Sequence, residues 1–253
     1  MRRLNEIREA VREKRPLIHC ITNPISMNQC ANAILALGAK PIMAEHPDEV
    51  MEITRTASSL LLNLGNITDS RISSMRLALK EANSNGIPVT LDAVGAACSS
   101  LRKTLVRLFL TSGKFACLKG NYSEIMALFD DTYKAAGVDA KEGVDGELIR
   151  RAVLELSSAN KCIVVATGKV DLVAFDGEVK EVTGGVAQLS QVTGTGCMLG
   201  AIIATYLAEE NSLQSVVNAC TFFKACGEKA ATDTGIGTFM VNLLDAIGGS
   251  YES

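Results

Sequence analysis

Short runs of apolar residues alternate along the chain with longer segments in which apolar residues recur every three or four positions. Nearly continuous apolar runs are typical of parallel strands that are covered on both faces, whereas the longer period is typical of amphipathic helices. We expect strands at residues 17–21, 59–64, 88–92, 115–118 and 161–166. Helical patterns separate several of them, at 69–84, 101–110 and 145–159. The alternation predicts βαβ units and a mainly parallel sheet.

The second half of the chain changes pattern twice. Strand-like segments at 170–175 and 178–182 flank Asp176-Gly177, a pair that favours a tight hairpin turn, so we expect an antiparallel pair at one sheet edge. Beyond residue 196 the pattern is helical, with helices expected at 197–209, 212–232 and 238–247. No linker or repeat interrupts the chain, and segment 134–146 is interpreted as a surface loop. The sequence predicts one α/β domain over residues 1–253.

Composition narrows the class of protein. The 253 residues carry a net charge of -3, only 4 % are aromatic and none is Trp, which argues against a nucleic-acid groove. The charged N-terminal segment lacks the apolar stretch of a signal peptide, and no run of about 18 apolar residues could span a membrane, so we expect a cytoplasmic protein. The mean hydropathy of +0.20 is high for a soluble monomer and favours an oligomer.

The eight cysteines and two histidines do not indicate a metal centre. No two cysteines form a CxxC pair, and the histidines are not spaced as a metal clamp. Most of the cysteines stand in apolar runs, where a reduced thiol packs as a small hydrophobic side chain.

A glycine-rich loop at residues 192–197 is the most informative motif. Gly194 and Gly196 alternate with threonines and lead directly into an apolar helical segment. Backbone N–H groups at such a helix start favour an anion, and glycine permits close approach of a ligand. Cys197 follows at once, in the first turn of the expected helix. The alternative is an ordinary strand-to-helix turn with a buried cysteine.

Polar side chains stand where the predicted strands end, which is where open α/β sheets bind ligands. Asp92 closes the strand at 88–92 and could anchor Mg²⁺ or substrate, or cap a helix. Lys119 is a candidate phosphate partner. Asn121 and Glu124 offer oxygen ligands to hydrated Mg²⁺, but their spacing is also that of a helix capping box. Thr167 ends the next strand, where a nucleotide could lie.

The first predicted strand carries a further polar motif. It runs into Asn23, and beyond it Asn28 and Asn32 lie four residues apart on one helix face, which suits either a ligand or a buried polar network. Met43 stands at the tip of the short segment that follows this helix. Alone, a methionine there is interpreted as a filler of the core.

Together these groups suit phosphoryl transfer. That chemistry requires oxygen ligands for a metal, a cation and backbone donors around the migrating group, and the strand ends supply all three. The chain contains neither a Walker A lysine motif nor a kinase catalytic-loop signature. We therefore expect a different phosphotransferase architecture.

Six motifs, in this order and spacing, resemble those of the hydroxyethylthiazole kinase family of thiamine salvage, which has the ribokinase-like fold. They are HCITNP at 19–24, GAKPIM at 38–43, LDAVG at 91–95, KGNYSE at 119–124, ATG at 166–168 and VTGTGC at 192–197. The resemblance extends from about residue 4 to 248 and includes GIGTF at 235–239.

The resemblance implies a three-layer αβα fold and ATP-dependent phosphorylation of the hydroxyl of 4-methyl-5-(2-hydroxyethyl)thiazole, with Mg²⁺ as cofactor. It also implies a homotrimer with sites at subunit boundaries. The roles that it implies are thiazole contact for Met43, Gly194 and Asn23, ATP contact for Lys119, Thr167 and Gly196, Mg²⁺ binding for Asp92 and Glu124, and contact with the reacting hydroxyl for Cys197.

Two residues depart from the family pattern, and two other functions compete. Ala93 replaces a usual proline, and Lys119 stands where relatives often have arginine, so a forked donor becomes a point charge. The first alternative is another ribokinase-like enzyme, such as a hydroxymethylpyrimidine-type kinase or a nucleotide-hydrate dehydratase. The pattern of those enzymes is a Gly-x-Gly-Asp loop, whereas this chain has Cys197 at the place of the aspartate. The second alternative is a catalytically silent binding protein.

Overall fold

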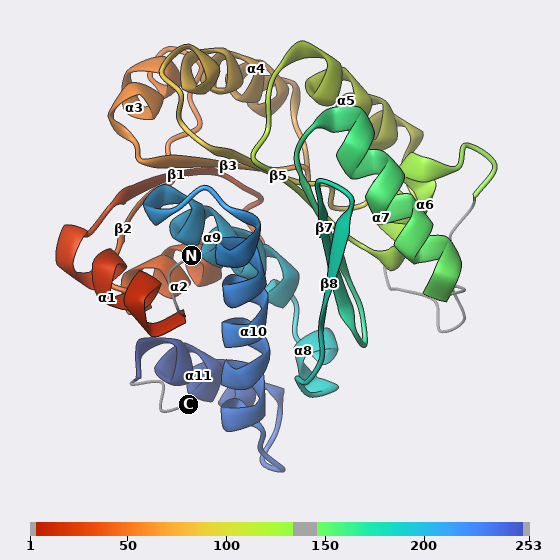
Figure 1. Ribbon diagram of the computed structural model, residues 1–253. Coiled ribbons are helices and arrows are strands. Elements are labelled where there is room, and N and C mark those ends of the chain that lie inside the picture. The colour runs from red at the N-terminus through yellow and green to blue at the C-terminus, as the bar shows by residue number, and fades with distance from the viewer. Residues whose placement is uncertain (1–3, 134–145, 250–253) are drawn as a thin grey trace.

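The computed structural model describes residues 4–133 and 146–249, and its centre is a twisted sheet covered by helices on both faces (Figure 1). The strands are β1 (Leu17–Ile21), β2 (Lys40–Ile42), β3 (Ser59–Asn63), β4 (Val89–Asp92), β5 (Cys117–Asn121), β6 (Ile163–Thr167), β7 (Asp171–Phe175) and β8 (Glu178–Val182). Their order in the sheet is β2-β1-β3-β4-β5-β6-β7-β8. The six strands from β2 to β6 pair in parallel, and β7 and β8 are antiparallel.

Two groups of helices cover the sheet. On one face, the strands are in contact with α2 (Met27–Ala36), α9 (Thr195–Glu209) and α10 (Leu213–Ala230), and α1 (Leu4–Lys14) and α11 (Ile236–Gly248) pack on these helices. The other face packs against α3 (Val50–Thr56), α4 (Asp69–Ser84), α5 (Ser100–Ser112), α6 (Tyr122–Phe129) and α7 (Gly146–Asn160), while the short α8 (Gln188–Gln191) precedes α9. Helices on both faces of a mainly parallel sheet confirm the predicted three-layer αβα class with its antiparallel edge pair.

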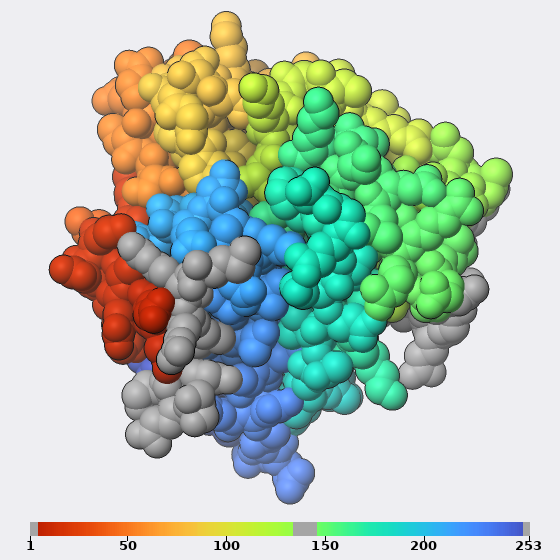
Figure 2. Space-filling view, viewed as in Figure 1, coloured from red at the N-terminus to blue at the C-terminus, as the bar shows by residue number. Residues whose placement is uncertain are grey.

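The segments that cover the α9 face come from distant parts of the sequence. Helix α1 packs against α9 and α10, and α10 packs against β7 and β8. In the space-filling view, the red N-terminal segment, the blue C-terminal segment and the teal hairpin accordingly lie side by side (Figure 2). Helix α9 lies beneath them, buried from Thr195 to Leu207 except at Gly196, so its N-terminus is fixed against the sheet.

The structure adds elements that the hydrophobic pattern did not reveal. Strand β2 has only three residues and includes Pro41, and α1 has a strongly charged sequence, so neither gives a clear apolar run. Helix α9 begins at Thr195, two residues earlier than expected. Most of the loop expected at 134–146 lies outside the described residues. Within the described residues, no helix is both long and apolar enough to cross a membrane.

Candidate active site

The parallel register brings three polar side chains into one row. Asn63 at the end of β3 pairs with Asp92 at the end of β4, and Asp92 pairs with Lys119 on β5. Paired residues of neighbouring strands point to the same face of a sheet, so this row lies on one face. Helix α9 crosses that face closely, because a Cβ atom on Gly200 would stand 3.2 Å from Asp92 Oδ2. A larger residue at position 200 would push the helix away from the aspartate.

A buried ion pair forms the centre of the row. Lys119 Nζ lies 3.0 Å from Asp92 Oδ1 and 3.2 Å from Oδ2, and it also donates to Gly196 O at 2.9 Å. Burial alone would lower the pKa of Lys119, but the charge of Asp92 raises it above its ordinary value. Burial raises the pKa of Asp92, and Lys119 and Asn63 oppose that rise. The lysine thus joins the aspartate to the glycine-rich loop at the start of α9.

Cys197 lies next to this ion pair and faces two side-chain amides. The Sγ atom accepts from Asn63 Nδ2 at 3.2 Å and from Asn23 Nδ2 at 3.5 Å. Asn63 also donates to Asp92 Oδ2 at 3.0 Å, and its Oδ1 accepts from Asn23 Nδ2 at 3.0 Å and from Gly65 N at 2.8 Å. The backbone donor of Gly65 determines which way the Asn63 amide points. Asn63 therefore connects Asp92 with Cys197.

Asn63 is the site residue that the sequence analysis missed. The predicted strand at 59–64 is confirmed as β3, but a single asparagine at the end of an apolar run is not by itself a sign of a site. The available signal was its place in the pattern, because Asn63 and Asp92 each follow three apolar or hydroxyl-bearing strand residues and each stands just before a loop. A polar residue that is fully buried at a strand end needs partners there.

Glu124 is held differently from Asp92, by backbone donors. Its Oε2 accepts from Asn121 N at 2.7 Å, and its Oε1 accepts from Gly95 N at 2.7 Å. Asn121 Oδ1 accepts from Glu124 N in return, so the capping box anticipated from the spacing is present at the start of α6. Burial raises the pKa of Glu124 to about 7, with the charge of Asp92 adding to the rise and Lys119 opposing it. The carboxyl group thus titrates near neutral pH.

The glycine-rich loop has the geometry expected of a helix start. Gly194 is the N-cap of α9 with φ of 95°, a conformation that side chains rarely adopt, and a Cβ atom there would meet Ser26 Cβ at 3.2 Å. Thr195 Oγ1 donates to Leu189 O at 2.5 Å and lies 3.1 Å from Val192 O, which ties the loop to α8. Because Gly194 has no side chain, it leaves the first-turn N–H groups of α9 uncapped.

Thr167 stands farther along the same sheet edge. It pairs in register with Asn121, and its Oγ1 donates to Gly120 O at 3.4 Å. The next residue, Gly168, lies against the ring of Tyr122, where a Cβ atom would come within 2.9 Å of ring carbons. The half-buried Thr167 is the outermost of the predicted site residues on this side.

Met43 lies on the opposite side of the cluster, half-buried against the α9-side core. The segment after it is fixed by the Arg71–Glu45 ion pair at 2.7 Å and by His19 Nε2, which lies 2.9 Å from Ala44 O. Burial lowers the pKa of His19. This histidine therefore supports the backbone next to Met43.

The two asparagines on the face of α2 do not form the buried network considered for them. Asn32 Nδ2 donates to the backbone oxygen and to Oδ1 of Asn28, each at 3.0 Å, on the exposed side of the helix.

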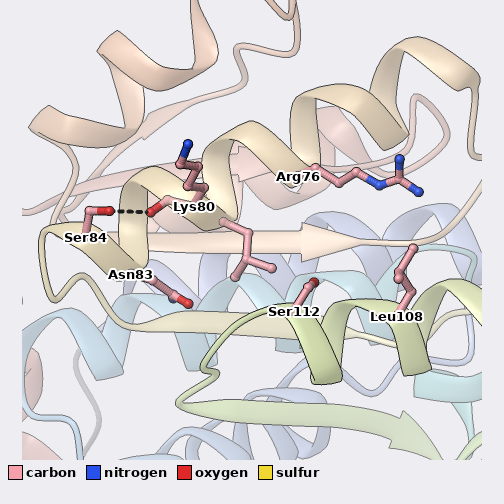
Figure 3. A pocket seen from close by; sticks show the side chains of 7 residues that line it. Arg76, Lys80, Asn83, Ser84, Leu108 and Ser112 are labelled. Carbon is pink, nitrogen blue, oxygen red and sulfur yellow. Dashed lines mark hydrogen bonds between the residues drawn. The ribbon is translucent and has the colours of Figure 1, made fainter.

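A large surface hollow lies away from the strand ends. Its volume is about 670 Å³, and it opens between α4 and α5 (Figure 3). The residues that line it are Arg76, Leu79, Lys80, Asn83, Ser84, Leu108 and Ser112. None belongs to the cluster around Asp92, and the hollow offers no carboxylate. The chemistry of the chain is therefore assigned to the strand ends and not to this hollow.

Known proteins with similar sequences and structures point to one family. Residues 8–249 match the model of the hydroxyethylthiazole kinase family. Hydroxyethylthiazole kinase 2 of Clostridium botulinum is 43 % identical over 249 residues, covering 95 % of this chain and 92 % of that protein. The structure of a hydroxyethylthiazole kinase protein from Pyrococcus horikoshii OT3 is 35 % identical, with a TM-score of 0.88, over 97 % of this chain and 92 % of that one. A ribokinase-like superfamily protein from Enterococcus faecalis, 12 % identical with a TM-score of 0.66 over 97 % and 94 % of the two chains, shares the fold.

Proposed function

The chain belongs to the hydroxyethylthiazole kinase family, and we propose that its strand-end cluster is where a phosphoryl group passes from ATP to the hydroxyl of 4-methyl-5-(2-hydroxyethyl)thiazole in thiamine salvage. The observation that carries this assignment is the direct contact between Cys197, Asn63 and Asp92, next to the N-terminus of α9. A helix N-terminus attracts a phosphoryl group, and the carboxylate and the thiol lie beside it. An acceptor hydroxyl at Cys197 would face that phosphoryl group.

Asp92 and Glu124 would hold Mg²⁺ together with the phosphates of ATP. Among the described residues, no group of three His, Cys, Asp or Glu side chains could hold a metal unaided. The two buried carboxylates suit a cation that keeps water and phosphate ligands, because Asp92 Oδ1 and both carboxylate oxygens of Glu124 each accept one hydrogen bond and so keep a second lone pair. Bound Mg²⁺ would supply charge neutralisation for the transferring group. Burial is the main cause of the raised pKa of Glu124, and the added effect of the Asp92 charge supports a cation shared by the two carboxylates.

The nucleotide would lie between α9 and the end of β6. The first-turn N–H groups around Gly196 would face its phosphates, and Thr167 would line the outer part of the site. Lys119 Nζ already contacts Asp92 and Gly196 O. Its positive charge would therefore attract the phosphates through the glycine-rich loop, without direct contact between the ammonium group and a phosphate oxygen. A lysine suits this buried position because its ammonium group is a compact point charge.

The thiazole alcohol would bind on the Met43 side of Cys197. Met43 offers an apolar, polarizable surface to the ring, and the positive φ of Gly194 lets the ligand approach the loop. The amide of Asn23 lies beside the thiol and would orient the acceptor hydroxyl. Cys197 would position that hydroxyl, and because the transition state of phosphoryl transfer is loose, the alcohol need not lose its proton early.

We also propose a cytoplasmic homotrimer whose sites lie at subunit boundaries. Large apolar side chains are exposed on or next to α2 and α11, which pack against each other; they are Ile25, Leu35, Ile236 and Val241. Exposed apolar side chains on two neighbouring helices suit contact with a second copy of the chain. Light scattering should give about three times the 26.8 kDa chain mass, whereas a single species near 26.8 kDa would contradict the proposal.

An ADP-release assay over a panel of alcohols tests the function. We expect Mg²⁺-dependent release with the thiazole alcohol and at most weak release with hydroxymethylpyrimidine or sugar alcohols. A preference for the pyrimidine would favour the related kinase, and repair of a hydrated nicotinamide nucleotide without phosphorylation of any alcohol would favour the dehydratase. Binding of thiazole or nucleotide without any turnover would favour the silent binding protein.

A further inference from the structure

A second buried ion pair lies behind the nucleotide side of the site, and the reaction described above does not use it. Lys224 on α10 and Asp171 at the start of β7 are both buried, with Lys224 Nζ 3.4 Å from Asp171 Oδ1. A buried ammonium group is costly unless it is paired and hydrogen-bonded, so its partners indicate what it organises.

Those partners are backbone carbonyls of two separate segments. Lys224 Nζ donates to Lys169 O at 3.2 Å and lies 3.4 Å from Gly168 O, and it also donates to Gly184 O at 3.3 Å. Asp171 Oδ1 accepts from Gly168 N at 3.0 Å. Both ends of Gly168 are therefore held by the same ion pair. Burial raises the pKa of Asp171, and Lys224 opposes that rise.

Helix α10 also holds the segment that leads toward the glycine-rich loop. Glu228, one turn beyond Lys224, accepts from Gly185 N at 2.7 Å through its Oε1. Gly184 and Gly185 have φ of 92° and 85°, so this segment relies on conformations that need support. Farther along, Gln188 Nε2 donates to Thr232 O at 2.7 Å. Helix α10 thus fixes both the turn after Thr167 and the segment at residues 184–185 before α9, which we call the Gly184 strap.

We propose that Lys224 is a positioning residue for the nucleotide, acting through the Gly168 turn and the Gly184 strap. This inference depends on the proposed ATP contact of Thr167 and the N-terminus of α9. Removal of the ammonium group would leave Asp171 and three carbonyls without their common donor, and the turn after β6 would move relative to α9. The affinity for ATP would fall, while the Met43 side of the site would keep its geometry.

The test compares Lys224→Met and Lys224→Arg with Arg71→Met as the matched control. Arg71 is also a buried cation paired with a carboxylate, but it fixes the segment after Met43 on the thiazole side. For Lys224→Met we expect the KM for ATP to rise about 10-fold or more, with the KM for the thiazole alcohol within about twofold. Lys224→Arg should recover part of the loss because it restores the charge. Arg71→Met should leave the KM for ATP unchanged.

Calorimetric binding of a non-hydrolysable ATP analogue separates this inference from the proposed function, because it does not require turnover. Weaker binding to folded Lys224→Met than to the wild type and to Arg71→Met supports the inference even if the thiazole alcohol proves not to be the substrate. Unchanged binding, or an equal loss in Arg71→Met, overturns it. If Lys224→Met does not fold, Asp171→Asn gives the decision, because it keeps an oxygen for Gly168 N and removes only the charge paired with Lys224.

Discussion

Asp92 at the end of β4 and Glu124 in the first turn of α6 are both buried carboxylates, yet their surroundings compensate the charge in different ways. Asp92 faces the ammonium group of Lys119 and the amide of Asn63. Glu124 faces the backbone N–H groups of Gly95 and Asn121, and its pKa is raised to about 7. Burial raises the pKa of both carboxyl groups, and at Asp92 a hydrogen-bonded opposite charge counters that rise, whereas Glu124 is held mainly by backbone dipoles. The contacts of Asp92 thus favour its charged form through Lys119, whereas Glu124, with a pKa of about 7, responds to pH and to a cation.

The largest effect is expected from loss of the charge on Asp92. In Asp92→Asn, Lys119 would remain buried without its counter-charge, so we expect the free energy of unfolding to fall by about 3 kcal/mol. We also expect kcat to fall by about 10³-fold, since the cation would lose a ligand and the ordered row would loosen. Urea denaturation and ADP release measure the two effects. Full activity in the folded variant would remove Asp92 from the mechanism.

A smaller, graded effect is expected at the thiol. Cys197→Ala should lower kcat by about 10- to 1000-fold, because positioning of the hydroxyl is lost but no obligatory base is removed. Cys197→Asp should keep or raise kcat, since a carboxylate accepts from the amides of Asn23 and Asn63 and can act as a base, while its charge would raise the KM for ATP. Steady-state kinetics on both variants decide between the roles. If both were folded and inactive, the thiol itself would be essential.

Because of Glu124, both the activity and the stability of the protein should depend on pH. As pH falls through about 7, a proton would compete with the cation, so kcat/KM for ATP with Mg²⁺ should fall about tenfold per pH unit. Stability should change in the opposite sense: the folded-state pKa lies above the ordinary value of 4.5, so the free energy of unfolding should decrease as pH rises from 4.5 to about 7. Glu124→Gln should remove both dependences. A pH profile that is unchanged in this variant would assign the titration to another group.

Local pattern was enough to predict the fold class and most strand ends, because apolar runs and turn residues act over a few positions. Asp92 and Cys197 stood beside recognisable glycine loops, and the alternative offered for Glu124, a capping box, proved correct as structure. That capping contact does not exclude a metal role, which stays a prediction. Both uses rely on the same side chain.

The local pattern could not predict contacts between residues that are distant in the sequence. Asn63 contacts residues 29 and 134 positions away, and Lys119 contacts a carbonyl 77 positions away. These contacts depend on strand order and on how α9 crosses the sheet, neither of which a run of neighbouring residues specifies. For the same reason Lys119 was considered only as a phosphate partner, although in the folded chain its ammonium group is bound to Asp92.

The most direct test of the shared cation is to measure Mn²⁺ binding by electron paramagnetic resonance in the presence of a non-hydrolysable ATP analogue. If Asp92 and Glu124 hold one divalent cation with the nucleotide, Glu124→Gln should weaken Mn²⁺ binding in this complex by about 10-fold or more, and Asp92→Asn should do so as well. Circular dichroism should first establish that both variants are folded. Equal Mn²⁺ affinity in the wild type and both folded variants would contradict the account.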